Sequence, residues 1–338
     1  MLNERILYRV MTEYGGYLPL EMNEKGGELY SENNDYTVWR LNCGRFAIVA
    51  ALKSCEVGRV FIPYYNCHVV ETALQKYGYT ISKYKIDRNF MPLLDSISEN
   101  DWIVYTDYFG ICTLKTKEEI IRKYRNVIFD NTQAFFSDPI IKKGVFNVYS
   151  CRKFFGVSDG AYVISNRKTD IDNLYNKDFS WERCAYLIKS YELGTNGAYG
   201  DSLQSEESIG YEIKLMSDFT RIMMQSINYE TVREKRNRNF NYLVEQFADI
   251  NDIKLKSNES TAPMIYPLLV HNEELRTYLI QKKIYVPQWW KYLIDTMKES
   301  DFEVELSKYL IPLPIDQRYS LEDMNDIVNI LRAKCENK

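Results

Sequence analysis

The sequence predicts an α/β protein: a three-layer αβα unit with a mostly parallel sheet, followed by a smaller C-terminal α+β unit. Two patterns indicate this fold class. Short apolar stretches alternate with helical stretches of about ten residues, the spacing of parallel strands joined by crossover helices. Several apolar stretches stop at a polar or aromatic residue, as strands do at the edge of an open sheet where ligands bind. With 338 residues, the chain is long enough for two structural units.

The first half of the chain carries this alternation. Residues 1–36 are expected to form a helical start and a polar loop, and Cys43-Gly44-Arg45 is a glycine turn that leads into a helix over residues 46–52. We expect strands at residues 60–63, 80–86, 102–107, 126–130, 145–150 and 161–165. Helices are expected between them at residues 69–77 and 117–124. Such crossovers make the strands parallel and place helices on both faces of the sheet.

The second half is expected to lead away from the sheet. Residues 166–209 are polar and helical, with a glycine-rich region at residues 194–200, and we interpret them as a mobile connector or lid, in the form of a solvated loop. Apolar residues at helical spacing predict one long helix over residues 214–247, which would bridge to the smaller unit. Strands at residues 264–270 and 310–315, and helices at 273–281 and 321–334, are expected there. The predicted domains are therefore residues 1–225 and 226–338.

The composition excludes several classes of protein. Hydrophobic residues make up 45% of the chain and charged residues 27%, as in ordinary soluble proteins. A net charge of −4 gives no electrostatic reason to expect nucleic acid or an anionic membrane as a partner. No apolar run is long enough to span a bilayer, and Met1-Leu2-Asn3-Glu4-Arg5 lacks the order of a signal peptide. We therefore expect a cytoplasmic protein.

The cysteines and histidines of the sequence do not favour a metal site or a disulfide framework. The seven cysteines show no CxxC spacing, so reduced thiols are expected rather than a zinc site or a disulfide framework. The only histidines are His68 and His271, which leaves few ligands for a metal and little material for a serine-type triad. No metal is expected, and any chemistry should depend on a bound cofactor.

One lysine, Lys153, is the strongest nucleophile candidate. It lies behind a hydroxyl in Ser150-Cys151-Arg152-Lys153 and before the aromatic pair Phe154-Phe155 and a glycine. Loss of hydration among aromatic residues lowers the pKa of an ammonium group and frees the amine for Schiff-base chemistry. The alternative is an ordinary surface lysine, and the motif by itself does not decide between the two.

The residues at the ends of the expected strands favour a nucleophilic Lys153 over an ordinary surface lysine. Tyr65, Tyr108 and Asp130, and Ser150 together with Lys153, each follow the C-terminal end of a strand, so they should converge on one crevice. The glycine turn at Gly44 and Arg45 presents backbone N–H groups at a helix N-terminus, which suits a phosphate.

These groups match the needs of a pyridoxal phosphate site. Such a site requires a lysine, a carboxylate on the pyridine nitrogen, a phosphate cup at a helix N-terminus and an aromatic ring over the cofactor. Asp130 precedes Lys153 by 23 residues, enough for a strand, a turn and the next strand, which would place both at the same sheet edge. The alternative interpretation of Asp130 is an aspartate that only shapes the turn at a strand end.

The same residues resemble the sugar aminotransferase family named after DegT, DnrJ, EryC1 and StrS, within the fold type I pyridoxal-phosphate enzymes. The resemblance lies in Cys43-Gly44-Arg45, in the Asp-x-x-Gln element Asp130-Asn131-Thr132-Gln133, in Ser150-Cys151-Arg152-Lys153 and in Asp159-Gly160. It covers most of the chain. It implies an aminotransferase that moves an amino group from an amino acid such as L-glutamate to a keto group of a nucleotide-linked sugar, in surface polysaccharide or related biosynthesis.

The resemblance also implies roles for individual residues. Lys153 would bind the cofactor as a Schiff base and move the proton between Cα and C4′. Asp130 would pair with the pyridine nitrogen, and Gln133 would lie near the ring hydroxyl. Ser150 and the backbone of Gly44 and Arg45 would hold the phosphate.

The stacking ring is less closely defined by the motifs. Tyr65 is our choice, and a shifted register would favour Asn66, Cys67 or His68 instead. Tyr108 is a further pocket candidate. The lysine at position 153 argues against the dehydrating members of the family, which replace it with histidine.

The sequence also departs from the family pattern. Sugar aminotransferases of this type commonly carry Gly-Tyr-Asn-x-Arg, whose asparagine reaches the phosphate in the partner subunit of a homodimer. Gly210-Tyr211-Glu212-Ile213-Lys214 stands in that place, and a glutamate would repel phosphate. Either Ser217 takes over this contact or the contact is absent. This departure motivates an alternative function: a cofactor-free relative that serves the same pathway as a binding or scaffold subunit.

Overall fold

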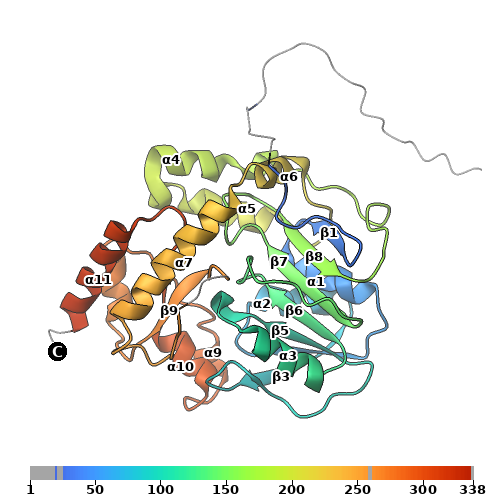
Figure 1. Ribbon diagram of the computed structural model, residues 1–338, viewed down its shortest axis with the longest axis horizontal. Coiled ribbons are helices and arrows are strands. Elements are labelled where there is room, and N and C mark those ends of the chain that lie inside the picture. Colours follow the sequence, from blue (N-terminus) through green and yellow to red (C-terminus); the bar gives the residue numbers. More distant parts are fainter. Residues whose placement is uncertain (1–19, 21–25, 258–260, 336–338) are drawn as a thin grey trace, which may run out of the picture.

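The protein is described by a computed structural model, which covers residues 20, 26–257 and 261–335. Its centre is an eight-stranded sheet with the strand order β1-β8-β7-β6-β5-β2-β3-β4 (Figure 1). Strands β2, β3, β5, β6 and β7 run parallel, whereas β8, β1 and β4 are antiparallel to their neighbours. The strands are β1 (Thr37–Leu41), β2 (Arg59–Pro63), β3 (Thr80–Ile86), β4 (Pro92–Leu93), β5 (Trp102–Thr106), β6 (Val127–Asn131), β7 (Val145–Ser150) and β8 (Ala161–Ser165). The mostly parallel sheet confirms the predicted fold class.

Alternating side chains of the strands build two separate hydrophobic layers. In β5, Trp102 and Val104 pack with α1 (Gly44–Lys53) and α2 (His68–Lys76). Ile103 and Tyr105 point to the opposite face, where they pack with α3 (Leu114–Lys123). Successive residues of a strand face opposite sides, so continuous apolar runs are suited to a sheet covered on both faces. The result is the expected three-layer arrangement.

Strand β1 was not expected, because Arg40 and Asn42 interrupt its apolar pattern. Its five residues pair antiparallel with β8. The chain then passes directly from β1 through Asn42 and Cys43 into α1. Asn42 is buried, and its carbonyl accepts a hydrogen bond from the N–H of Gly160 at 2.6 Å. This edge pairing therefore joins the start of α1 to the loop that follows Lys153.

The solvated loop expected at residues 166–209 is wrong for most of its length. It contains η2 (Trp181–Arg183), α4 (Ala185–Gly197) and α5 (Tyr199–Ser208). Helices α4 and α5 pack against each other at the top of the view in Figure 1. Gly194, with φ of 72°, breaks the helical geometry inside α4. The helical character of this stretch was expected, but its polar composition and outward-facing apolar side chains favoured a solvated loop over two packed helices.

The single long helix expected over residues 214–247 is also wrong. The chain forms α6 (Asp218–Gln225) and α7 (Tyr229–Gln246) with a short turn between them. Ser217 caps α6 by accepting a hydrogen bond from the N–H of Thr220, and Asn228 caps α7 in the same way from Thr231. Each cap satisfies an N–H group that a helix start leaves without a partner. Both capping residues were present in the sequence, but apolar residues at helical spacing lie on both sides of the break, so the pattern predicted one helix.

The C-terminal part packs around a second, two-stranded sheet, on the left of Figure 1. Strands β9 (Ile265–Leu269) and β10 (Leu310–Pro314) pair antiparallel, and helices α7, α8 (Leu275–Gln281) and α11 (Leu321–Cys335) share their core. Helices α9 (Leu293–Thr296) and α10 (Phe302–Tyr309) complete this part. The predicted boundary after residue 225 falls in the turn between α6 and α7, and the division into two domains stays a prediction.

A buried arginine connects this part to the sheet. Arg236 of α7 donates hydrogen bonds to the carbonyls of Pro263 and Met264 at 3.2 Å, and its guanidinium lies 4.6 Å from the ring centroid of Phe154. Burial lowers the pKa of Arg236 to about 10, which still leaves it protonated at neutral pH. Its position directly beside Phe154 links the smaller unit to the loop of Lys153.

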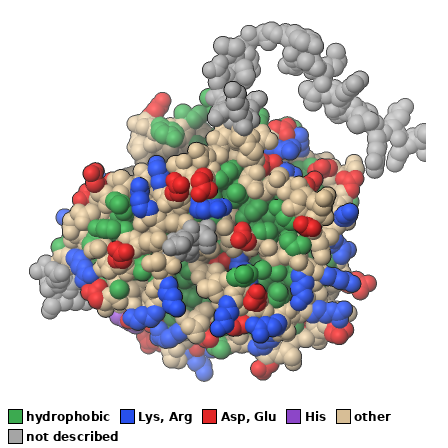
Figure 2. Space-filling view, viewed as in Figure 1, with side chains coloured by type: hydrophobic (Ala, Val, Ile, Leu, Met, Phe, Trp, Pro, Cys, Tyr) green, Lys and Arg blue, Asp and Glu red, His purple; other side chains and the backbone are tan. Residues whose placement is uncertain are grey.

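The surface is mixed in charge. On the face shown in Figure 2, basic and acidic side chains are intermingled. No helix in the described part of the chain is both long and apolar enough to cross a membrane. Within the same residues, no group of three or more histidine, cysteine, aspartate or glutamate side chains could hold a metal ion.

Candidate active site

Lys153 lies in the turn after β7 and is exposed in the single chain. Its Nζ donates a hydrogen bond to Oγ1 of Thr132 at 3.1 Å, and no carboxylate of the described residues pairs with it. The expected shielding by aromatic neighbours is wrong: Phe154 and Phe155 point into the core, where Phe155 packs 4.9 Å from Phe135. Lys153 is therefore a solvent-exposed side chain at the sheet edge, bonded to Thr132.

Asp130 is the penultimate residue of β6, directly before the turn that carries Thr132. Only 3% of its surface is exposed, and its Oδ1 accepts a hydrogen bond from the N–H of Thr132 at 3.1 Å. No lysine or arginine in the described ranges forms an ion pair with it. Because a buried carboxylate without a cation is costly, this geometry suits a ligand that brings a positively charged N–H group. The structure thus places Asp130 and Lys153 at the ends of neighbouring strands, β6 and β7, at one edge of the sheet.

The N-terminus of α1 lies against the same turn. A Cβ atom on Gly44 would lie 2.8 Å from Cγ2 of Thr132, so only glycine fits without a shift. Cys43 precedes the helix and provides no side-chain cap, which leaves the first N–H groups for an anion. Burial raises the pKa of the Cys43 thiol to about 11, so no thiolate would repel an anion there.

Gly160 lies in the loop after Lys153, and its N–H bonds the carbonyl of Asn42, just before α1. Its φ of 111° belongs to the region that favours glycine, and an added Cβ would lie 3.0 Å from Sγ of Cys151. The preceding carboxylate, Asp159, is buried and accepts hydrogen bonds from the N–H and Oγ of Ser217, both at 2.8 Å. Ser217 is therefore held inside the chain, which argues against its reaching a partner subunit. The side chain of Glu212, in contrast, is 76% exposed.

Two arginines beside α1 hold one glutamate. Glu206 of α5 forms ion pairs with Arg152 at 2.6 Å and with Arg45 at 3.3 Å. Burial opposes ionisation of Glu206, but the two guanidinium groups outweigh it and hold the pKa of the carboxyl below its usual value. The Nε atoms of Arg45 and Arg152 are buried without hydrogen-bond partners among the described residues. Arg45 therefore brings a buried positive side chain, besides its backbone N–H, to the helix end.

Gln133 connects this turn to the next strand end. Its Oε1 accepts a hydrogen bond from the N–H of Phe109 at 3.0 Å, and the residue is buried. Phe109 belongs to η1 (Tyr108–Gly110), where its φ is 62°. Ser150 is likewise buried at the end of β7. These residues occupy the predicted edge of the sheet.

The aromatic candidates form a cluster of their own. Tyr108 donates its hydroxyl to the carbonyl of Tyr65 at 2.6 Å, and Tyr65 packs edge-on against Trp290 with a centroid distance of 4.2 Å. Tyr65 is fully buried, and its hydroxyl has no hydrogen-bond partner in the described chain. Burial raises its pKa well above the ordinary range, so the phenol stays neutral. The role of Tyr65 as the stacking ring stays a prediction.

A buried ion pair lies beneath the two turns. Lys117 of α3 approaches Asp107 at 3.0 Å and donates a hydrogen bond to Oδ1 of Asn131 at 3.1 Å. Burial raises the pKa of Asp107, and Lys117 counteracts part of that effect. The N–H of Asp107 also bonds the carbonyl of Asp130 at 3.0 Å. The pair therefore holds the strand end that carries Asp130.

Several of these residues escaped the sequence analysis. Thr132 and Arg152 lie inside quoted motifs, but as the variable letters of those motifs. Glu206 and Lys117 lie far away in the chain; Glu206 belongs to the acidic pair Glu206-Glu207, but nothing in the sequence connected either residue with the site. Two adjacent tryptophans, Trp289 and Trp290, are rare in a sequence and could have indicated an aromatic contact. Nothing near them in the sequence connects them with Tyr65.

The residues present fit pyridoxal phosphate. Its ring nitrogen requires a carboxylate without another cation, which Asp130 provides. Its aldehyde requires a lysine that is not paired with an acid, which is Lys153. Its phosphate requires an uncapped helix N-terminus, which α1 presents at Gly44, packed against Thr132. The fold comparison bears on the same question.

The structure is similar to several solved proteins. A DegT DnrJ EryC1 StrS aminotransferase from Brucella abortus is 14% identical with a TM-score of 0.58, over 88% of this chain and 85% of that one. A putative sugar aminotransferase from Streptococcus pneumoniae in its PMP form is 15% identical with a TM-score of 0.61, over 89% and 88%. This chain has the fold of the sugar aminotransferases. The predicted fold type I architecture is thereby confirmed.

The same fold also serves another reaction. A GDP-4-keto-6-deoxymannose-3-dehydratase with bound GDP-perosamine is 14% identical with a TM-score of 0.58, over 87% of this chain and 88% of that chain. No protein-family model and no curated protein sequence matches the chain. At these identities the sugar aminotransferase fold by itself does not decide the activity, so the side chains of the site must.

Proposed function

We propose that the protein is a pyridoxal-phosphate-dependent aminotransferase that aminates a keto group of a nucleotide-linked sugar. The observation that carries the proposal is the turn at residues 130–133. It holds a buried carboxylate without a cation, Asp130, beside Lys153, a lysine without an acid. The sugar aminotransferase fold supports the same conclusion.

The bound cofactor would supply an electron sink for carbanion chemistry. Asp130 would accept the N–H of the ring nitrogen and keep it protonated. The amine of Lys153 would bind the cofactor and later carry the proton at the substrate Cα. Thr132 would orient that amine, because its hydroxyl already accepts a hydrogen bond from Nζ. The N-terminus of α1 at Gly44 would bind the phosphate.

The comparisons support the substrate class that we propose. An amino acid such as L-glutamate would donate the amino group, and a keto sugar carried on a nucleotide would accept it. The solved dehydratase with GDP-perosamine bound supports a nucleotide-linked sugar, and the lysine at position 153 supports amination. We place the reaction in surface polysaccharide or related biosynthesis, in the cytoplasm.

The alternative is a cofactor-free binding or scaffold protein of the same pathway. It is favoured by Glu206, whose carboxylate neutralises Arg45 and Arg152 beside the helix end, and by the exposed Glu212. Both carboxylates would oppose a phosphate. In that case the sugar would bind without turnover.

A spectroscopic experiment separates these functions. Purified protein mixed with pyridoxal phosphate should develop the visible absorbance of a Schiff base, which L-glutamate should bleach. Borohydride reduction and peptide mass spectrometry should place the label on Lys153, and Lys153→Ala should lose the band. Lys142→Ala, a change of an exposed lysine before β7, should keep it. Absence of a band in the wild type, or an unchanged band in Lys153→Ala, would refute the aminotransferase.

A further inference from the structure

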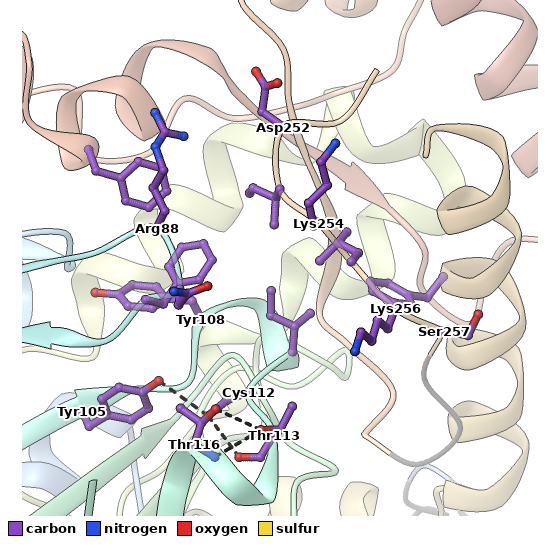
Figure 3. Close-up of a pocket in the computed structure, with 17 residues that line it drawn as sticks. Arg88, Tyr105, Tyr108, Cys112, Thr113, Thr116, Asp252, Lys254, Lys256 and Ser257 are labelled. Carbon is purple, nitrogen blue, oxygen red and sulfur yellow. Dashed lines mark hydrogen bonds between the residues drawn. The ribbon is translucent and has the colours of Figure 1, made fainter. Parts of the chain in front are cut away.

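A cavity of about 560 Å³ lies between the sheet and the C-terminal unit (Figure 3). Its walls come from the loop after β3, from the segment between η1 and the start of α3, and from residues 252–257. Pockets that hold small organic molecules have volumes of about 300–1,000 Å³, so the cavity has the size of such a site.

This cavity is separate from the Lys153 site. The backbone between them is closed by hydrogen bonds: the N–H of Met264 bonds the carbonyl of Phe109 at 2.7 Å, and the N–H of Phe109 bonds Gln133. Tyr108, the further pocket candidate named above, lines the cavity, but neither Lys153 nor Asp130 does. A ligand bound there would therefore occupy a second site.

One wall is aromatic. The ring centroid of Phe90 lies 5.3 Å from that of Tyr108 and 5.8 Å from that of Phe302, and all three rings line the cavity. Phe90 and Tyr108 are buried. Such a surface suits a planar group, because aromatic rings and bases gain from stacking.

The other wall is positively charged. Lys254 donates only to the carbonyl of Asn251 at 3.1 Å, and Lys256 has no partner among the described residues. Figure 3 shows Lys256 extending its amine toward Thr113 and Thr116 at the start of α3, where the positive end of the helix dipole lies and where Thr113 already caps the N–H of Thr116. Among residues 20, 26–257 and 261–335, no carboxylate forms an ion pair with either lysine.

The remaining charges leave these two lysines available. Arg88 is engaged with Glu305 at 2.5 Å and lies 5.1 Å from the ring centroid of Phe302. Asp252 is the carboxylate of the lining, and its nearest ion-pair partner is His271 at 3.7 Å. The lining therefore carries more positive than negative charge.

We propose that this cavity binds a nucleoside diphosphate, with the base against Phe90 and Phe302 and the phosphates between Lys254, Lys256 and the N-terminus of α3. The role is binding rather than chemistry, because burial raises the pKa of the one thiol in the lining, Cys112, to about 12 and leaves it unreactive. The site does not depend on the proposed aminotransferase activity. A ligand that contacts both units would stabilise the folded chain by mass action.

The test is calorimetric titration of the full chain with ADP, GDP, UDP and CDP, and separately with inorganic pyrophosphate. At least one nucleotide should bind and raise the thermal midpoint. Lys254→Ala/Lys256→Ala should weaken that binding at least about tenfold, since charged hydrogen bonds are lost. Lys142→Ala/Lys143→Ala removes the same charge before β7, at the opposite edge of the sheet, and should weaken it less than about twofold.

Three outcomes would overturn the proposal. One is the absence of nucleotide binding at millimolar concentration. Another is nucleotide binding that the Lys254→Ala/Lys256→Ala change leaves intact, which would place the nucleotide elsewhere, for example near Lys153. The third is pyrophosphate that binds as tightly as the nucleotides, because the aromatic wall would then contribute nothing. The titration is repeated with Lys153→Ala, which should bind the nucleotide as the wild type does. Nucleotide binding is then measured independently of the proposed aminotransferase activity.

Discussion

Asp107 and Lys117 show how single residues hold the candidate site without touching a ligand. Both are almost wholly buried, and between them they bond Asn131 and the backbone of Asp130. A buried ion pair contributes little net stability, but loss of one partner leaves a charge without compensation. The pair is therefore a positioning device whose removal should be visible in stability.

Lys117→Met should lower the free energy of unfolding by about 3–5 kcal/mol, because Asp107 would be left buried and unpaired. Urea denaturation measures the change. Adding Asp107→Asn should recover part of the loss, since the amide is neutral and still accepts the N–H of Cys112. Lys115→Met, an exposed change on the same helix, should stay within about 0.5 kcal/mol. A wild-type unfolding curve for Lys117→Met would contradict the role assigned to the pair.

At the scale of secondary-structure elements, the site depends on the contact between α1 and the turn at residues 130–133. Gly44 makes this contact possible, because the methyl group of Thr132 occupies the space a side chain would need. Thr132 also holds Lys153, so the packing of one helix end and the orientation of the amine are coupled.

Gly44→Ala should destabilise the protein by about 1–3 kcal/mol and weaken pyridoxal phosphate binding, because the new methyl group pushes α1 away from the turn. Thermal unfolding and cofactor titration measure both effects. The double variant Gly44→Ala/Thr132→Ser removes the clashing methyl and keeps the hydroxyl, so it should restore both. Gly200→Ala in α5 has open space around it and should be neutral or stabilising. Failure of the serine to rescue would show that the clash is not the cause.

Helix α5 is tied to the same region by Glu206. Its pKa in the folded protein lies below the usual value of 4.5, so its pairing stabilises the protein above that pH and is lost as the pH falls through the folded value. We expect the thermal midpoint of wild type to exceed that of Glu206→Gln at pH 7, and the gap to narrow toward pH 3. Glu192→Gln, without an ion pair in the described chain, should show no such gap. An equal gap at both pH values would exclude the linkage.

At the scale of the whole molecule, the exposed apolar side chains are unevenly distributed. Tyr191 of α4 is 94% exposed and Leu193 is 62% exposed. Others gather in the same stretch: Leu174, Phe179, Trp181, Ile188, Tyr199, Leu203 and Tyr211. Such a concentration is typical of an interaction surface. We propose that it forms the homodimer interface and that a second copy would cover Lys153, providing the desolvation that the single chain lacks.

Sedimentation velocity should therefore find a particle of about twice the 40.0 kDa chain mass. Tyr191→Lys/Leu193→Lys should convert it to monomer, because charge would be buried at the interface. Leu93→Lys, at an exposed apolar position on edge strand β4, should leave the dimer intact. A wild-type chain that sediments as a monomer at micromolar concentration would contradict the proposal.

Local pattern determined much of this protein by itself. The bounds of β3, β7 and β8 agree with the predicted strands, because continuous apolar runs between turns need no distant information. The position of Asp130 and Lys153 at neighbouring strand ends also followed from sequence, since parallel strands bring their carboxyl ends to one edge. The mostly parallel α/β sheet was predictable for the same reason, whereas the sugar aminotransferase fold followed from the resemblance of the motifs to that family.

Only the tertiary structure decided the rest. The pairing of β1 with β8 and the exposure of Lys153 depend on which distant segment lies opposite. The partners of the site residues do too: Thr132 and Gly44 are far apart in the chain, as are Glu206 and Arg45. Periodicity reports which face of a segment is apolar, whereas contact between segments depends on packing of the whole chain.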